Sequence, residues 1–76
     1  MEIFRILRHM DHLIRTKSTG APSDFARKLS ISRRSVYNYL EIIRELGAHV
    51  RYARGMQSYE YAPEGRLILT FNQENN

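Results

Sequence analysis

Two short segments in the middle of the chain repeat apolar residues at the spacing of a helix. In the first segment, Phe25, Ala26 and Leu29 fall on one face. Pro22 suits the first helical position, because its missing N–H costs nothing there. The apolar face of the second segment consists of Val36, Tyr39, Leu40 and Ile43. The pattern predicts two helices around a tight turn within residues 23–46.

The second of these helices has a start signal and a stop signal. Ser32 is a favoured N-cap residue, because its hydroxyl can accept a hydrogen bond from an early backbone amide of the helix. Gly47 follows the last periodic residue, Leu46, where a left-handed residue commonly ends a helix. We therefore expect this helix to span residues 33–46.

The N-terminal segment, from Glu2 to about Lys17, is also periodic and predicts a further helix. Phe4, Ile6 and Leu13 make its apolar stripe broader than one small core requires. Two interpretations stay open: the whole stripe is core, or these three side chains face a second subunit. The main stripe consists of Ile3, Leu7, Met10 and Ile14.

After Gly47 the apolar period becomes alternating, which predicts a β-hairpin. The register places Arg51 opposite Glu60 on the outer face. Residues 18–21 break the helical pattern. The other face of the hairpin would carry Val50, Tyr52, Tyr59 and Tyr61.

The tip of the hairpin would consist of Gly55 and Met56. A glycine in the first central position is what a type II′ turn requires. Beyond the hairpin, residues 67–71 have the pattern of another strand, and both of its faces are largely apolar. This strand would pack either on its own hairpin or across a homodimer interface. We therefore divide the chain into a domain at 1–62 and a C-terminal strand and tail at 63–76, a candidate dimerisation element.

Residues 3–62 resemble the bacterial winged helix-turn-helix regulators of the DeoR and biotin-repressor type. The resemblance implies an α+β, mainly α, fold: a winged helix-turn-helix with three helices and a β-hairpin wing, to which the alternating pattern adds a C-terminal strand. It also implies a strand of two or three residues within residues 18–21 that pairs with the wing. Ser30 departs from the family, which usually has glycine at this turn position, because a left-handed backbone is strained at a serine. The helix-turn-helix core of the family falls on Phe25, Ala26, Leu29, Ile31, Val36 and Tyr39, and its groove-facing positions on Arg33, Arg34, Tyr37 and Asn38.

Basic side chains are concentrated on this unit. Residues 15–54 hold nine basic side chains against three carboxylates, a net charge of +6, whereas the whole chain carries +4. Such a concentration attracts a polyanion and releases counterions from a phosphate backbone. Ten of the twelve basic residues are arginine, which suits bidentate contact with guanine edges, although arginine usage also follows genome composition.

Candidate DNA contacts lie first on the second helix of the pair. Arg33 and Arg34 would meet base edges at its N-terminal end, and the Asn38 amide could pair with adenine one turn further on. Tyr37 could contact a thymine methyl group or a phosphate. Ser32 and Ser35 would cap the helix or contact the backbone of the duplex.

Further candidates lie outside that helix. Ser23, Arg27 and Lys28 could contact phosphates, because helix N-termini and cations both attract them. Arg51, Arg54 and Gln57 would lie on or near the wing. Arg51 could instead pair with Glu60, and Arg54 lies nearest the tip.

Several other functions find little support in the sequence. The chain has no cysteine, so a cysteine-ligated metal site or a disulfide framework is excluded. His9 and His12 stand three apart without an obvious third ligand, so we predict no metal site. No nucleophile elbow, phosphate-binding glycine loop or paired carboxylates indicate an enzyme or a cofactor. No apolar run has membrane-spanning length, and we expect a soluble, cytoplasmic protein.

The sequence therefore predicts a sequence-specific double-stranded DNA-binding protein, acting as a small transcriptional regulator and binding as a homodimer. No small-molecule effector can be inferred. The alternative is a module of the same fold that joins proteins without binding DNA, through its first helix and terminal strand. Salt dependence separates the two, because binding through several phosphates weakens steeply with salt.

Overall fold

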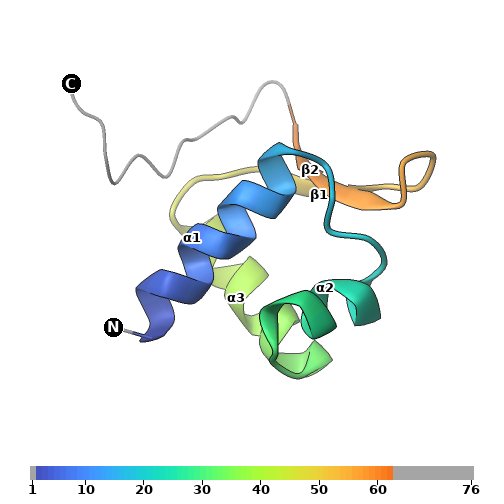
Figure 1. Cartoon of the computed structure of the whole chain (residues 1–76). Helices are drawn as coiled ribbons and strands as arrows, with labels where there is room; N and C mark the ends of the chain where they lie inside the picture. The colour runs from blue at the N-terminus through green and yellow to red at the C-terminus, as the bar shows by residue number, and fades with distance from the viewer. Residues whose placement is uncertain (1, 63–76) are drawn as a thin grey trace.

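The computed structural model of the chain describes residues 2–62 (Figure 1). Its three helices and antiparallel hairpin confirm the mainly helical winged helix-turn-helix fold. The predicted strand and tail at 63–76 lie outside the described residues. In chain order the elements are α1 (Glu2–Arg15), α2 (Pro22–Leu29), α3 (Arg33–Glu45), β1 (Val50–Ala53) and β2 (Ser58–Tyr61).

The core lies where the three helices meet the hairpin. Figure 1 shows α1 crossing in front of α3, with α2 beside the start of α3 and the hairpin near the C-terminal end of α1. The Phe25 and Tyr59 rings pack with centroids 5.6 Å apart, and Tyr52 packs edge-on against Tyr59 at 5.0 Å. Burying a large apolar side chain contributes about 1.5–3 kcal/mol. The side chains predicted to face inward are buried at Leu7, Met10, Ile14, Phe25, Ala26, Leu29, Val36, Leu40 and Ile43.

The broad stripe of α1 divides between the core and the surface. Ile6 and Leu13 are half-buried and pack against the core of the same chain. Ile3, which the periodicity assigns to the main stripe, is 39% exposed, and Phe4 is 54% exposed. The helix ends at Arg15, two residues earlier than predicted, because Lys17 adopts a left-handed conformation with φ 54°.

The turn between α2 and α3 follows the predicted signals. Ser30 has φ 59° and ψ 41°, the left-handed conformation expected where the family usually has glycine. The Ser32 hydroxyl accepts a hydrogen bond of 3.0 Å from the backbone N–H of Ser35, which confirms the N-cap of α3. Gly47 is left-handed at φ 106°, and α3 ends at Glu45, one residue before the predicted end.

The hairpin has the predicted register, but the predicted turn at its tip is wrong. Arg51 pairs with Glu60, and Tyr52 pairs with Tyr59. Gly55 has no positive φ, so the tip is not a type II′ turn; Gln57 is the left-handed residue, at φ 51°. Two successive turns close the tip, because the N–H groups of Met56 and Gln57 each bond the carbonyl three residues earlier.

The short strand expected within residues 18–21 is absent, so that prediction is also wrong. Lys17 and Gly20 both have positive φ, at 54° and 75°, and an extended segment cannot continue through such residues. Thr19 nevertheless bonds to β2, through its side chain and its backbone N–H. The chain therefore replaces strand pairing with specific hydrogen bonds to the wing.

Candidate nucleic-acid interface

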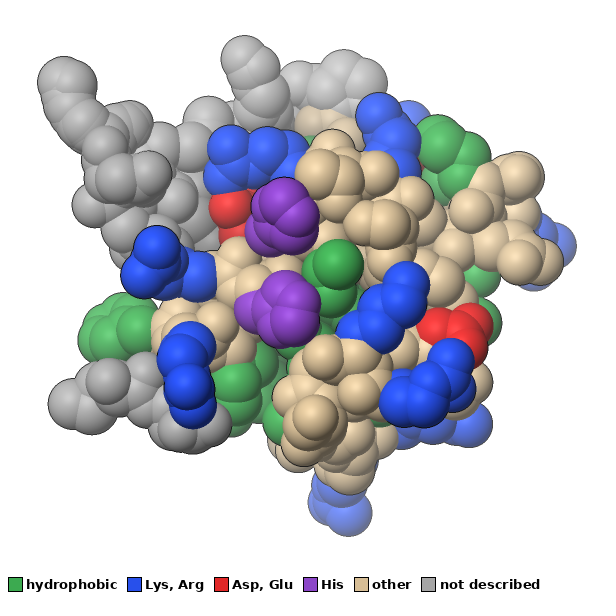
Figure 2. Space-filling view, in the orientation of Figure 1, with side chains coloured by type: hydrophobic (Ala, Val, Ile, Leu, Met, Phe, Trp, Pro, Cys, Tyr) green, Lys and Arg blue, Asp and Glu red, His purple; other side chains and the backbone are tan. Residues whose placement is uncertain are grey.

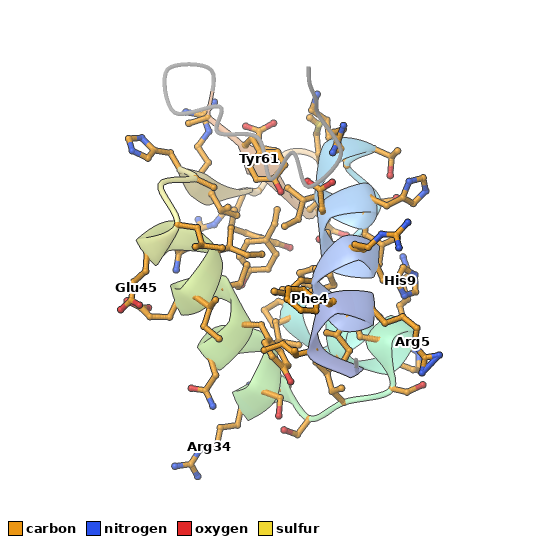
Figure 3. All side chains as sticks on the ribbon, turned by 90° about the vertical axis from the view of Figure 1, so that its left-hand side faces the viewer. Phe4, Arg5, His9, Arg34, Glu45 and Tyr61 are labelled. Carbon is orange, nitrogen blue, oxygen red and sulfur yellow. The ribbon has the colours of Figure 1, made fainter. Side chains whose placement is uncertain are left out.

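The outer face of α3 carries the residues that could meet another molecule. Because Val36, Leu40 and Ile43 point into the core, the helical period turns Arg34 and Asn38 outward. Figure 3 shows Arg34 extending away from the body of the molecule at the N-terminal end of α3. We call the exposed set Arg33, Arg34, Tyr37, Asn38 and Glu41 the reading face.

The first two turns of the reading face carry hydrogen-bonding groups suited to base edges. Arg33, Arg34 and Asn38 are exposed, and Tyr37 is 47% exposed. Arg34 and Asn38 are four residues apart, so they lie one turn apart on the same side. A guanidinium can bond guanine in a bidentate way, and a carboxamide can do the same with adenine.

Ser32 and Ser35 hold the start of this helix. The Ser32 hydroxyl also donates to the Ser35 hydroxyl at 3.0 Å. Both serines are therefore engaged with each other, and their first role here is to order the first turn of α3. That order fixes where Arg33 and Arg34 leave the helix.

Glu41 was not predicted as a DNA contact, although its position seven residues after Arg34 places it on the same face of the helix. Its side chain is exposed, as is that of Glu45 one turn further on. Figure 3 shows Glu45 at the end of α3 opposite to Arg34. The face of α3 that carries Arg34 therefore has cations at the first turn and the carboxylates Glu41 and Glu45 further along, while Arg44 of the last turn bonds the Val50 carbonyl.

Ion pairing separates the candidate cations into two groups. Arg27 pairs with Asp24 at 2.7 Å, and Arg51 pairs with Glu60 at 2.9 Å, the alternative that the sequence had suggested for Arg51. Within residues 2–62, Arg33, Arg34 and Arg54 form neither an ion pair nor a side-chain hydrogen bond. Their charges are uncompensated at close range, which favours binding of a polyanion at these three positions.

The start of α2 is partly neutralised by its own carboxylate. Asp24 accepts hydrogen bonds from Arg27 and from the backbone N–H of Ala21, at 3.2 Å for the latter. The Arg27 guanidinium first, and then the Ala21 N–H, hold the pKa of Asp24 below its usual range. Ser23 is exposed beside this group. A phosphate at this helix end would meet Asp24 as well as Arg27.

Lys28 lies on another side of the molecule. Its Nζ donates a hydrogen bond of 2.6 Å to the Ser18 carbonyl. It also lines a groove of about 400 Å³ between α1 and the end of α2, together with Arg5 and His9. Figure 3 shows Arg5 and His9 on the side of α1 away from Glu45. The structure therefore does not bring Lys28 together with the reading face.

The wing tip presents a second exposed group. Arg54 and Gln57 are exposed in the four-residue tip, and Met56 between them is 47% exposed. Arg51, by contrast, lies on the strand beside its carboxylate partner. Of the three wing candidates, Arg54 and Gln57 therefore reach furthest from the body.

A comparison with protein families agrees with this geometry. The model of the HTH domain family matches residues 5–58, from the first turns of α1 to the first residue of β2. The chain belongs to this HTH domain family. The matched range includes α2, α3 and the hairpin as far as Ser58. No curated protein and no solved structure matches the chain.

The described residues 2–62 contain neither a cluster of metal ligands nor a membrane-spanning helix. Figure 2 shows histidine side chains near each other on one face of the molecule. His9 and His12 are both exposed on α1. Across residues 2–62, no three histidine, aspartate or glutamate side chains cluster closely enough to hold a metal ion. No helix in the same range is both long and apolar enough to cross a membrane.

Proposed function

We propose that the protein binds double-stranded DNA in a sequence-specific manner and acts as a small transcriptional regulator of the DeoR and biotin-repressor type. The first two turns of α3 enter the major groove, and the hairpin lies as a wing on the flanking backbone or minor groove. We assign it no catalytic residue and no cofactor.

The observation that carries the proposal is that two guanidinium groups at the start of α3 have no ion-pair partner within residues 2–62. Arg33 and Arg34 project from a capped, rigid helix end and have no carboxylate partner within residues 2–62. A major groove about 12 Å wide admits one α-helix, and recognition helices contact bases with their N-terminal residues. We assign base contacts to Arg34 and Asn38, and a thymine methyl or phosphate contact to Tyr37.

The remaining candidates would position the protein on the phosphate backbone. Arg54 is the leading contact of this kind on the wing. The other candidates for this role are Ser23 and Arg27 at α2, Ser32 and Ser35 at α3, and Arg51 and Gln57 on the wing. The ion pair of Arg27 does not oppose this role, because an exposed pair is worth only about 0.2–1 kcal/mol and can be exchanged for a phosphate. Arg51 is less well supported, since its partner Glu60 has a side chain that is only 13% exposed. Lys28 is the least supported, since it faces the groove beside α1.

We further propose that the protein binds as a homodimer. A chain of 76 residues has a small core, and a second copy would add buried surface. Two copies related by a two-fold axis would place two α3 helices in successive major grooves, about 34–36 Å apart. Sedimentation of the protein with and without a selected duplex measures the stoichiometry. One copy per duplex would contradict the homodimer but not the proposed DNA binding.

The test of the proposed function is selection from a random duplex library. Arg34→Ala and Asn38→Ala should each relax the preference at one base position, at a cost of about 1–3 kcal/mol. Arg8→Ala is the matched control, because it removes an exposed arginine of α1 that lies outside the proposed interface. If Arg34→Ala and Asn38→Ala select the same sequences as the wild type with the same strength, the reading face is not the DNA-binding surface.

Salt dependence distinguishes this function from a protein-interaction module. Binding through several phosphates should weaken steeply as salt rises, because each neutralised phosphate releases counterions. Apolar association between proteins does not weaken in this way. A flat response, or no measurable DNA binding at low salt, would favour the interaction module.

A further inference from the structure

A buried group of hydroxyls joins the loop before α2 to the wing. Thr19 and Ser58 are 39 residues apart in the chain, and they are 0% and 1% exposed. The Thr19 N–H donates to the Ser58 hydroxyl at 3.1 Å, and the Tyr59 N–H donates to the Thr19 hydroxyl at 2.9 Å. The two hydroxyl oxygens lie 3.2 Å apart. We call this group, Thr19, Ser58 and the backbone N–H of Tyr59, the clasp.

Both hydroxyls of the clasp and the backbone N–H groups of Thr19 and Tyr59 have hydrogen-bond partners, which offsets the cost of burying them. The Thr19 hydroxyl lies 2.9 Å from the Gly20 carbonyl, and the Ser58 hydroxyl lies 2.9 Å from the Tyr59 carbonyl. Each hydroxyl has one proton to donate and lone pairs that accept from the backbone N–H groups. Loss of one hydroxyl leaves a buried donor or acceptor unpaired, which is costly. The clasp is therefore directional in a way that apolar packing is not.

The position of the clasp in the chain connects two candidate DNA-contacting units. On one side, Thr19 is only three residues from Pro22, the first residue of α2. The link lies close against α2: Gly20 is left-handed at φ 75°, and an added Cβ would lie 2.7 Å from the Cβ of Asp24. On the other side, Ser58 directly follows Gln57, the last residue of the wing tip.

Among residues 2–62 the hairpin has two other hydrogen-bonded attachments to the helices, and both are further from the tip. Tyr61, at the end of β2, bonds Asp11 of α1, and Arg44 of α3 donates to the Val50 carbonyl at the start of β1. Val50 and Tyr61 pair with each other at the base of the hairpin. Ser58 pairs with Ala53 at the opposite end, next to the tip. The clasp is thus the hydrogen-bonded attachment nearest the tip, beside the packing of Tyr59 on Phe25.

We propose that Thr19 and Ser58 are positioning residues that set the direction of the wing relative to the reading face, so that Arg54 and Arg34 contact the same duplex. The inference rests on the proposed function and extends it to residues that touch no DNA. Thr19 orients the tip through β2, and Ser58 holds Thr19 in place.

The experiment compares the effect of Arg54→Ala in two backgrounds, the wild type and Thr19→Val. Valine has nearly the shape of threonine but lacks the hydroxyl. In the wild type, Arg54→Ala should weaken DNA binding and lower the salt slope by about one, the loss expected for one phosphate contact. In Thr19→Val, the same change should have little effect, because the tip is already displaced. Arg34→Ala should relax base preference equally in both backgrounds.

The conservative variant Thr19→Ser keeps the hydroxyl and should restore the dependence on Arg54. A merely structural role of Thr19 would lower stability without changing how much Arg54 contributes to binding. Circular dichroism confirms that each variant is folded before binding is measured. If Thr19→Val does not fold, the same comparison with Ser58→Ala decides, since it leaves the bond between Tyr59 and Thr19 in place.

The outcomes separate the inference from the proposed function. An equal effect of Arg54→Ala in both folded backgrounds overturns the positioning role. No effect of Arg54→Ala in the wild type also overturns it, while the role of the reading face stands if Arg34→Ala still relaxes base preference. If Arg34→Ala and Asn38→Ala have no effect either, the proposed function itself fails.

Discussion

The Tyr61 hydroxyl donates a hydrogen bond of 2.6 Å to the Asp11 carboxylate, joining the end of β2 to the middle of α1 across fifty residues of chain. Asp11 is only 9% exposed, and its second oxygen accepts from Arg15. A buried carboxylate with two donors is stable where an unpaired one would not be. This contact, together with the clasp, ties the wing to the helices.

Tyr61→Phe should lower the free energy of unfolding by about 1.5–3 kcal/mol, the usual worth of a hydrogen bond to a charged group. Urea unfolding followed by circular dichroism measures the change. Tyr37→Phe is the control, because Tyr37 is 47% exposed and should tolerate the loss of its hydroxyl within about 0.5 kcal/mol. An equal effect of the two substitutions would show that the contact with Asp11 contributes nothing.

The same contact predicts a loss of stability in alkali. Burial, and then the hydrogen bond to Asp11, raise the pKa of Tyr61 above its usual value. The unfolded tyrosine loses its proton near pH 10, whereas the folded one keeps it, so stability is complete below about pH 10 and falls as the pH rises further. Wild-type unfolding free energy should decline more steeply above that pH than that of Tyr61→Phe. Parallel declines would contradict the assignment.

Ser30→Gly should stabilise the protein by about 0.5–1 kcal/mol, because glycine adopts the left-handed conformation of this turn without strain. The φ of 59° and ψ of 41° at Ser30 are the basis of the prediction. Ser30→Ala is the control and should bring no gain, since alanine has the same steric restriction as serine. Thermal unfolding of the three proteins gives the order, and a loss of stability in Ser30→Gly would show that the serine side chain matters more than the strain.

Two glycines should respond in opposite directions to alanine. Gly20→Ala should destabilise the chain by more than about 1 kcal/mol, because φ is 75° and the new Cβ would collide with Asp24. Gly55→Ala should be neutral or stabilising by up to about 1 kcal/mol, since its φ is not positive and no atom lies within 4 Å of an added Cβ. Urea unfolding compares the pair. Equal effects would mean that the tip needs a glycine for another reason.

Glu41→Gln should raise the affinity for duplexes of unselected sequence severalfold, if the reading face enters the groove as proposed. The carboxylate of Glu41 repels phosphates, and at a base edge it accepts only from a donor such as the cytosine amino group. Glutamine keeps the size and removes the charge, so binding should become stronger and less selective. Glu45→Gln, one turn further from Arg34, should have a smaller effect in the same anisotropy titration. An affinity unchanged by Glu41→Gln would place this turn outside the groove.

Local signals predicted much of the fold. The three helices and the hairpin register follow from periodicity, which depends only on neighbouring positions. The sequence also predicted the Ser32 cap and offered Glu60 as an alternative partner of Arg51, and the structure has both contacts. Two expectations were wrong, namely the turn type at the tip and the strand before α2. At the tip, the residue with positive φ is Gln57 and not Gly55. Before α2, the positive φ values of Lys17 and Gly20 prevent an extended strand.

The outward direction of Arg34 and Asn38 was determined by the sequence alone, because an amphipathic helix must turn its polar side away from the core. The tertiary structure decided which polar groups are engaged. Lys28 bonds the Ser18 carbonyl, Thr19 bonds Ser58, and Tyr61 bonds Asp11. These contacts join residues 10 to 50 positions apart. They depend on how the helices and the hairpin pack in space, and the hydrophobic periodicity of the sequence does not predict that packing.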